Sequence, residues 1–235
     1  MRPRIVEVRQ NILKKNDLLA ATLRERFEAE AVLVVSLVSS PGSGKTLLLE
    51  RTLAALKQRT RVGALVGDLQ TDNDARRLAA AGVPVQQITT GTVCHLDAEM
   101  IARALDAWRP GALDILFIEN VGNLVCPASY DLGEALRVVL LSVTEGEDKP
   151  LKYPTIFNSA DLAVITKIEL ADVVGFDRAA ARAAIEQVRP GLEVLELSAR
   201  SGAGFDAWIA RLEQARDAVR AAGGAAAISS PATAR

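Results

Sequence analysis

The sequence predicts an α/β fold, in which a doubly wound, mostly parallel sheet lies between two layers of helices and follows an N-terminal helix. Continuous apolar runs of strand length alternate along the chain with segments whose apolar residues recur at helical spacing. Such alternation is typical of a parallel sheet that helices cover on both faces. With 235 residues, 49% of them apolar and 24% charged, the chain is long enough for one such domain with a sizeable core.

The elements follow in order from this pattern. Apolar residues at helical spacing over residues 5–30 predict an amphipathic helix, or two, in an N-terminal segment that spans residues 1–30. The main domain is expected over residues 31–221, and the small, low-complexity residues 222–235 predict a disordered tail. The predicted strands are 31–39, 61–68, 83–88, 113–119, 137–143, 161–167 and 192–198. The predicted helices are 45–58, 73–81, 97–108, 177–188 and 204–221.

The composition excludes several classes of protein. A net charge of −1 and an aromatic content of 4% argue against a surface for nucleic acid or for an anionic membrane. Two cysteines make no disulfide framework, and no apolar run has the length of a signal-peptide core or a membrane span. The sequence therefore predicts a cytoplasmic protein that binds neither nucleic acid nor membrane.

The octapeptide SSPGSGKT, which begins at Ser39, lies between the first predicted strand and a helical run. It matches the P-loop pattern G-x-x-x-x-G-K-[ST] except that Ser39 stands at the first glycine. Gly42 and Gly44 let backbone N–H groups converge on phosphate oxygens, and the helix N-terminus adds its dipole. Lys45 is expected to reach the β and γ phosphates, and Thr46 to bind Mg²⁺. A glycine-rich turn without a ligand is the alternative. The expected phosphate-binding residues are Pro41, Gly42, Ser43, Gly44, Lys45 and Thr46.

The ends of two later strands point to guanine as the base. Lys167 and Glu169 in ITKIEL stand where guanine-specific proteins carry [NT]-K-x-D. A carboxylate there accepts two hydrogen bonds from guanine N1–H and N2–H₂, whereas adenine offers no such donor pair. Glu169 is one methylene longer than the expected Asp. Ser198, Ala199 and Arg200 end the last strand, where a backbone N–H would contact the guanine oxygen. An ordinary strand with an exposed Lys/Glu pair is the alternative.

Two acidic residues at predicted strand ends, Asp68 and Glu119, complete the phosphate side. In P-loop proteins a carboxylate at such a place holds Mg²⁺ directly or through water. Gly122 in the sequence ENVG stands where a D-x-x-G switch would turn toward a γ phosphate. Only Asp72 and Asp74 are candidates for positioning the attacking water, so we expect slow turnover. The expected catalytic residues are Lys45, Asp68 and Glu119.

The chain holds one histidine and two cysteines, and His95 directly follows Cys94. Thiolate and imidazole ligands suit Zn²⁺, or Ni²⁺ in a more planar geometry, and Cys126 is the third such residue. Three ligands are too few for a closed tetrahedral site, and neighbouring side chains point apart along a backbone. We therefore expect an open site, or one shared across a two-fold dimer, with Asp97, Glu99 or water in the remaining positions. The alternative is two buried free cysteines and a histidine at a helix start.

Six segments, in order, resemble the hydrogenase nickel-incorporation GTPases of the HypB type, metallochaperones among the metal-handling P-loop GTPases. The segments are LVSSPGSGKT, GDLQTDNDARRL, TTGTVCHLDAEM, FIENVGNLVCPASYDLGE, SVTEGEDKPLKYP and ITKIEL. The resemblance implies a P-loop NTPase fold, hydrolysis of GTP to GDP and phosphate, and a homodimer promoted by GTP. It also implies delivery of nickel to the hydrogenase large subunit with a second nickel-binding accessory protein. Cys94, His95 and Cys126 become ligands of Ni²⁺ or Zn²⁺ near the dimer interface.

Three departures from the family and three alternatives accompany this resemblance. Residues 1–30 contain no Cys or His, so the N-terminal cysteine motif of the family is absent, as is any His-rich stretch. Glu169 replaces the usual Asp. Ala128 follows Cys126-Pro127 where the urease-type relative carries His, which favours the hydrogenase assignment over urease. Other functional classes supply two further alternatives. These are an ATP-dependent small-molecule kinase and a switch that binds nucleotide without hydrolysing it.

Overall fold

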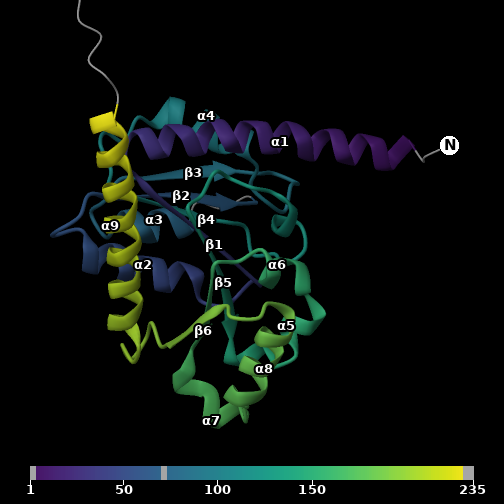
Figure 1. The fold of residues 1–235 in the computed structure, drawn as a ribbon. Helices are drawn as coiled ribbons and strands as arrows, with labels where there is room; N and C mark the ends of the chain where they lie inside the picture. Colours follow the sequence, from purple (N-terminus) through teal and green to yellow (C-terminus); the bar gives the residue numbers. More distant parts are fainter. Residues whose placement is uncertain (1–3, 70–72, 230–235) are drawn as a thin grey trace, which may run out of the picture.

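The computed structural model describes residues 4–69 and 73–229 and places seven strands in one sheet (Figure 1). The strands are β1 (Leu33–Ser39), β2 (Val62–Asp68), β3 (Val85–Thr89), β4 (Ile115–Glu119), β5 (Leu136–Ser142), β6 (Leu162–Thr166) and β7 (Glu193–Leu197). Their order is β3-β2-β4-β1-β5-β6-β7, and every neighbouring pair is parallel. All seven strand predictions and the doubly wound α/β class are confirmed.

The longer helices were also predicted, whereas the short ones were not. The predicted helices correspond to α1 (Arg4–Ala29), α2 (Lys45–Leu56), α3 (Asn73–Ala79), α4 (Ala98–Trp108), α8 (Arg178–Val188) and α9 (Phe205–Ser229). The sequence analysis missed α5 (Lys149–Lys152), α6 (Pro154–Asn158), α7 (Ala171–Val174) and the 3₁₀ turns η1 (Pro127–Ser129), η2 (Val143–Glu145) and η3 (Ile168–Leu170). Each of these is about one turn long, which is too short for an apolar period to show.

The three layers follow from the alternation of side chains along the strands. Leu33, Val35 and Leu37 of β1 face one side of the sheet. They join a buried cluster with Leu49 of α2 and Trp208 of α9. The alternate residues face the other side, where α1 and α4 cover one half and α6 and α8 cover the other. Figure 1 accordingly shows α2 and α9 across the sheet from α6 and α8.

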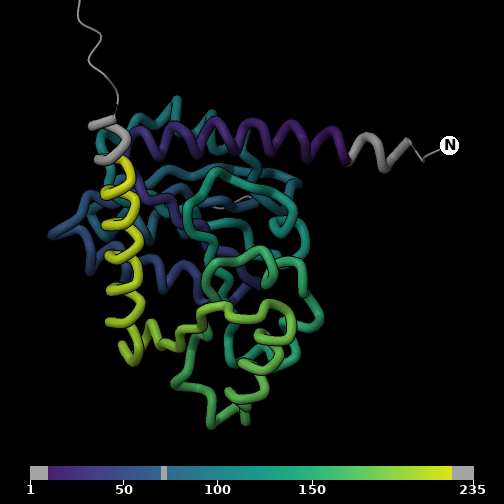
Figure 2. The backbone as a smooth tube through the Cα atoms, viewed as in Figure 1, coloured from purple at the N-terminus to yellow at the C-terminus, as the bar shows by residue number. Residues whose placement is uncertain are grey.

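The N-terminal segment forms one continuous helix, α1, rather than two. Ala20, Leu23 and Phe27 on α1 are buried in the same cluster as Ile101 and Leu105 of α4. The C-terminal end of α1 meets α9, as the path of the backbone shows (Figure 2). Helix α1 is therefore packed onto the domain, as its amphipathic pattern predicted.

The expected end of the last helix at residue 221 was wrong. Helix α9 continues through Ser229, so residues 222–229 are helical where the sequence predicted a disordered tail. Four of these eight residues are alanines, whose high helix propensity offsets that of the two glycines in extending the helix that Phe205 begins. Residues 230–235 of that predicted tail lie outside the described residues. Among the described residues, no helix combines the length and apolar character needed to cross a membrane.

A buried carboxylate joins the amino ends of two strands to α9. Asp114 lies just before β4 and accepts hydrogen bonds from the backbone N–H and the guanidinium of Arg61, before β2. Arg220 of α9 donates to the same carboxylate at 2.7 Å. The Arg61 guanidinium, the first cause, holds the pKa of Asp114 well below its usual range, and Arg220 adds to this. This network holds α9 at the amino ends of the strands, whereas the phosphate loop follows the carboxyl end of β1.

Candidate nucleotide and metal site

The phosphate loop joins the end of β1 to the start of α2. Gly42 and Gly44 have φ values of 73° and 96°, in the left-handed region where a side chain is disfavoured. Gly44 is the N-cap of α2, and no side-chain hydrogen bond caps this helix. The first backbone N–H groups and the dipole of α2 are therefore directed at the loop, which is the arrangement that binds a phosphate group.

Lys45 lies folded into this loop and is only 7% exposed. Its Nζ donates a hydrogen bond of 2.9 Å to the Oγ of Ser39, the residue that replaces the first glycine of the P-loop pattern. The Ser39 hydroxyl also bonds the carbonyl of Ser40 at 2.7 Å and the hydroxyl of Ser43. Burial lowers the pKa of Lys45, and the charge of Glu119 partly opposes this shift. Ser39 thus gives the buried ammonium a partner inside the loop.

Glu119, at the end of β4, lies beside Thr46. Thr46 Oγ1 donates to Glu119 Oε1 at 2.8 Å, while Glu119 Oε2 is buried with no hydrogen-bond partner among the described residues. Glu119 is 3% exposed, and burial raises its pKa to about 7, against the opposing charge of Lys45. A buried carboxylate oxygen without a partner, next to a threonine hydroxyl, fits the oxygen ligands that Mg²⁺ prefers.

The other predicted acidic residues belong to β2 and to the sequence that follows it. Asp68 ends β2, which β4 separates from β1, and its Oδ1 accepts a hydrogen bond from the backbone N–H of Leu69 at 2.5 Å. Asp74 lies in the first turn of α3, and its negative charge acts on both Lys45 and Glu119. Asp72, the other candidate for positioning water, lies outside the described residues.

Gly122 lies directly against the phosphate loop. A Cβ built on Gly122 would be 2.9 Å from Pro41 Cα and 3.1 Å from Pro41 N, so only glycine fits without a shift of backbone. The segment after Glu119 therefore touches the loop a second time. This close approach is what the predicted switch position requires.

Two residues at the end of β6, where the sequence predicts base contacts, bind the phosphate loop. Thr166 Oγ1 donates to the Ser43 carbonyl at 2.7 Å, and Lys167 Nζ donates to the Gly42 carbonyl at 2.6 Å. Lys167 has a φ of 59°, which turns the chain sharply after the strand. Glu169 follows in η3 and is exposed, so its carboxylate is accessible to a base.

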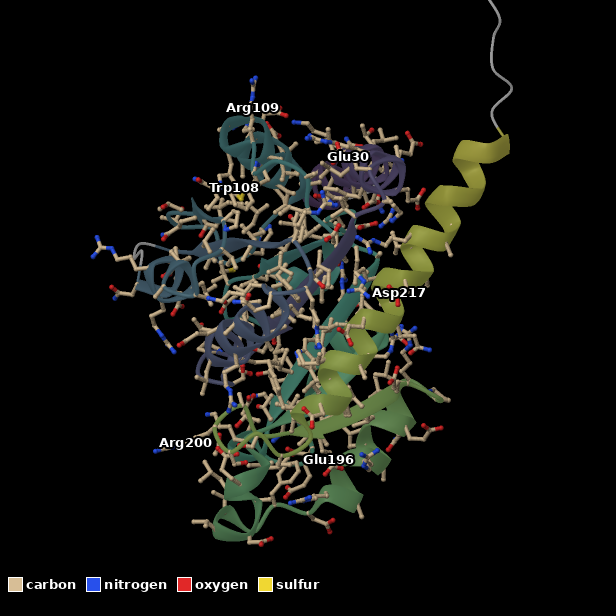
Figure 3. The ribbon with its side chains drawn as sticks, turned by 90° about the vertical axis from the view of Figure 1, so that its left-hand side faces the viewer. Glu30, Trp108, Arg109, Glu196, Arg200 and Asp217 are labelled. Carbon is tan, nitrogen blue, oxygen red and sulfur yellow. The ribbon has the colours of Figure 1, made fainter. Side chains whose placement is uncertain are left out.

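The loop after β7 is fixed by its own serine and by α2. Ser198 Oγ accepts hydrogen bonds from the backbone N–H groups of Arg200 and Ser201, at 3.2 and 2.9 Å. Arg51 of α2 donates to the carbonyls of Ala199 and Arg200, at 2.5 and 3.1 Å. The side chain of Arg200 itself points outward from the molecule (Figure 3). Sequence reasoning missed Arg51, because nothing near it in the sequence indicates a contact with a loop 148 residues away.

Cys94, His95 and Cys126 come together in one chain, and their ligand atoms all lie within 4.8 Å of one another. The two Sγ atoms are 2.9 Å apart, and both residues carry thiols rather than a disulfide. The expectation that Cys94 and His95 point apart was wrong. The backbone bends at both residues, instead of running as a strand, and the bend brings the neighbouring side chains to one side.

The surroundings of these three residues suit a metal ion. His95 Nδ1 is buried with no partner among the described residues, and burial lowers the pKa of His95, which favours the neutral, metal-binding imidazole. The ring of Tyr130 lies 4.0 Å from that of His95 between centroids. Asn123 Oδ1 accepts from the backbone N–H of Cys126 at 3.4 Å, and its Nδ2 donates to the Cys94 carbonyl at 3.4 Å. Tyr130 and Asn123 were missed, because only the fold reveals which residues support a ligand.

The two carboxylates considered as extra ligands already have other partners. Asp97 caps α4 by accepting from the backbone N–H of Met100 at 2.8 Å. Glu99 is partly exposed and pairs with Lys15 and Arg103, the first of these at 2.9 Å. Among the described residues, the candidate metal ligands that lie together are therefore Cys94, His95 and Cys126. Three ligands leave further coordination positions for water or a partner.

One segment, residues 119–126, joins the phosphate loop to the cluster of Cys94, His95 and Cys126. Asn120 directly follows Glu119, and its Oδ1 accepts from the backbone N–H groups of Leu96 and Val121, at 3.0 and 2.9 Å. Leu96 in turn directly follows His95. The segment then passes Gly122 at the phosphate loop and ends at Cys126. The loop that begins at the buried carboxylate thus reaches all three soft ligands.

Comparison with known proteins shows what this chain is similar to. The family model described as CobW/HypB/UreG, nucleotide-binding domain, matches residues 33–196. The hydrogenase maturation factor HypB of Azotobacter vinelandii is 53% identical over 213 residues, which cover 91% of this chain and 70% of that protein. The hydrogenase/urease maturation factor HypB of Helicobacter pylori is 46% identical over 199 residues, which cover 83% and 81%. The crystal structure of HypB from Helicobacter pylori in complex with nickel superposes with a TM-score of 0.82 at 42% identity, covering 86% of this chain and 95% of that one.

Proposed function

The chain belongs to the CobW/HypB/UreG family of nucleotide-binding domains, and from this premise we propose that it is a GTP-hydrolysing nickel metallochaperone. It helps to insert nickel into the large subunit of a hydrogenase, together with a second nickel-binding accessory protein, in the cytoplasm. The similarity to hydrogenase maturation factors over 91% of the chain supports the process, and the phosphate loop and soft-ligand cluster support the two binding activities.

GTP binds with its phosphates over the N-terminus of α2, and its base between the ends of β6 and β7. Bound Mg²⁺ supplies charge neutralisation for the β and γ phosphates, and Thr46 and Glu119 are the residues that hold it, with Asp68 nearby. Lys45 leaves Ser39 for the phosphate oxygens, which are stronger acceptors than a hydroxyl. Asp74 is the described candidate for orienting the attacking water. Among the described residues, none clearly positions this water, so hydrolysis is slow.

The observation that carries the proposal is the segment from Glu119 to Cys126. Its first residue bonds Thr46, Gly122 lies against Pro41, and its last residue is a thiol of the soft-ligand cluster. A γ phosphate that moves the first part of the segment therefore changes the geometry at Cys126. Nickel, the cargo, is held in one nucleotide state and released in the other.

The soft-ligand cluster lies close to an exposed apolar residue. Val125, directly before Cys126, is 64% exposed. Three ligands leave metal positions open, which residues of a second copy of the chain can fill. We therefore place the GTP-promoted homodimer interface beside the metal site, with Ni²⁺ or Zn²⁺ near it.

The decisive experiment measures the affinity for nickel with GDP and with a non-hydrolysable GTP analogue bound. We expect the two affinities to differ by about tenfold or more, which corresponds to about 1.4 kcal/mol of coupling. The variant Cys126→Ser is the matched control, because it removes one ligand and leaves the phosphate loop intact. Equal nickel affinities in the two nucleotide states of the intact protein would contradict the coupling.

Two further measurements test the class of enzyme. ATP that displaces bound GTP at comparable concentration would favour a small-molecule kinase instead. Lys45→Ala is expected to abolish phosphate release. A wild-type protein that binds GTP without measurable phosphate release would instead be a nucleotide switch.

The urease-type assignment is tested by activation of the two apoenzymes. Ala128 follows Cys126-Pro127 in this chain, and the absence of a histidine there favours hydrogenase. The Helicobacter pylori relative is named for both hydrogenase and urease maturation, so both assays are informative. We expect the protein to increase nickel insertion into an apo-hydrogenase large subunit and not into apo-urease.

A further inference from the structure

Asn16 is a buried polar residue in the N-terminal helix, and its side chain bridges two segments far away in the sequence. Its Nδ2 donates to the Asp131 carbonyl at 2.9 Å, and its Oδ1 accepts from the backbone N–H of Ala98 at 2.9 Å. Asn16 is 5% exposed. Both halves of the amide are thus used, and each bonds a backbone group.

The two bridged segments are those that shape the soft-ligand cluster. Ala98 begins α4, three residues after His95, and Asp131 directly follows Tyr130. The rings of His95 and Tyr130 lie against each other, with centroids 4.0 Å apart. Asn16 therefore fixes the distance between the backbone that carries His95 and the backbone that carries the ring beneath it.

A second residue of α1 strengthens the same contact. Arg24 Nη2 donates to both carboxylate oxygens of Asp131 at 2.7 Å, and Gly133 N–H donates to one of them at 2.8 Å. The apolar residues of α1 between Asn16 and Arg24, such as Ala20 and Leu23, are buried under this part of the domain. Helix α1 is thus bonded at two places to the loop that follows Cys126.

We propose that Asn16 is a positioning residue of the metal site, so that helix α1 is a structural part of that site. The inference rests on the proposed metal-binding function. Residues that orient a ligand typically change metal affinity 10- to 100-fold when they are replaced. The amide suits this place, because one side chain must both donate to a carbonyl and accept from an N–H.

The test compares Asn16→Ala and Asn16→Asp with the wild-type protein. Asn16→Ala loses both hydrogen bonds, whereas Asn16→Asp has the same shape, keeps the acceptor for Ala98 and loses the donor to Asp131. We expect each variant to lower the affinity for Ni²⁺ about tenfold or more, measured by competition with a chromophoric chelator. We also expect the thiolate-to-metal charge-transfer band of bound Co²⁺ to change, while the affinity for GDP stays within about twofold.

Thr22→Ala is the matched control, because Thr22 lies on the same helix and its hydroxyl bonds only the Leu18 carbonyl of α1 in the described structure. Wild-type nickel affinity in Asn16→Asp would overturn the inference, as would parallel losses of nickel and GDP affinity, which indicate general destabilisation. A wild-type protein that binds no nickel would instead contradict the proposed function itself, so the two failures are distinguishable.

Discussion

Pro41 and Gly122 lie so close together that a methyl group on Gly122 would be 2.9 Å from Pro41 Cα. We expect Gly122→Ala to push the segment from the phosphate loop at a cost of about 1–3 kcal/mol, as overpacking does. GTP affinity should fall accordingly, and nickel affinity should lose its dependence on nucleotide. Titration of both ligands checks this. The control Val173→Ala changes an exposed residue of α7, outside this segment. Normal coupling in Gly122→Ala would refute the role of the contact.

Ser39 provides the hydrogen-bond partner of Lys45 inside the loop. In Ser39→Ala the buried ammonium loses this partner, which should lower the free energy of unfolding of the nucleotide-free protein by about 1–3 kcal/mol. Bound GTP supplies its own oxygens to Lys45, so the variant should gain more thermal stability from GTP than the wild type gains. Thermal unfolding with and without GTP measures the difference, and equal gains would contradict the role of Ser39.

Glu169 tests the choice of base. If its carboxylate accepts from guanine N1–H and N2–H₂, Glu169→Gln replaces one acceptor by an NH₂ donor and should weaken GTP binding about tenfold or more. Xanthosine triphosphate carries an oxygen at C2, so its affinity for the variant should rise. Direct binding of the two nucleotides decides the matter. A variant with unchanged preference would show that Glu169 does not contact the base.

Tyr130 supports His95 through its ring rather than its hydroxyl. We therefore expect Tyr130→Phe to keep the nickel affinity of the wild type and Tyr130→Ala to lower it about tenfold. The pair separates ring packing from hydrogen bonding within one position. Nickel competition measurements on both variants provide the check, and an equal loss in the two would point to the hydroxyl instead.

Asp114 makes stability depend on pH in acid. Its folded pKa is depressed, first by Arg61, so the carboxylate contributes stability above its ordinary pKa of 3.8 and loses it as pH falls further. Asp114→Asn should lower the free energy of unfolding by about 2 kcal/mol at pH 7, and this difference should shrink below about pH 4. Urea unfolding at several pH values measures it. The exposed residue Asp106, 78% exposed, gives the control Asp106→Asn.

The strands and the phosphate loop could be predicted because they are local patterns. A buried parallel strand reads as an apolar run, and GKT after such a run has few other interpretations. The tail was misjudged for the same reason, since an alanine-rich segment of low complexity is compatible with both disorder and helix. Local pattern also suggested that Cys94 and His95 diverge, which holds for a strand but not for the bend that the chain forms there.

The residues that support the site could not be predicted, because their partners are remote. Asn16 bonds groups 82 and 115 residues away, and Arg51 bonds a carbonyl 148 residues away. No spacing in the sequence encodes such contacts, which arise only when the sheet has formed. The candidate ligands were thus found from residue type, and the residues that hold them from the fold.

The contact between Arg51 and the loop after β7 lowers the entropic cost of nucleotide binding. The carbonyls of Ala199 and Arg200 are held by α2, the same helix whose first turn we propose as the phosphate site. A base that binds there, as proposed, enters a loop whose conformational entropy was already lost when the chain folded. Association need not order that loop again, so more of the contact energy appears as affinity.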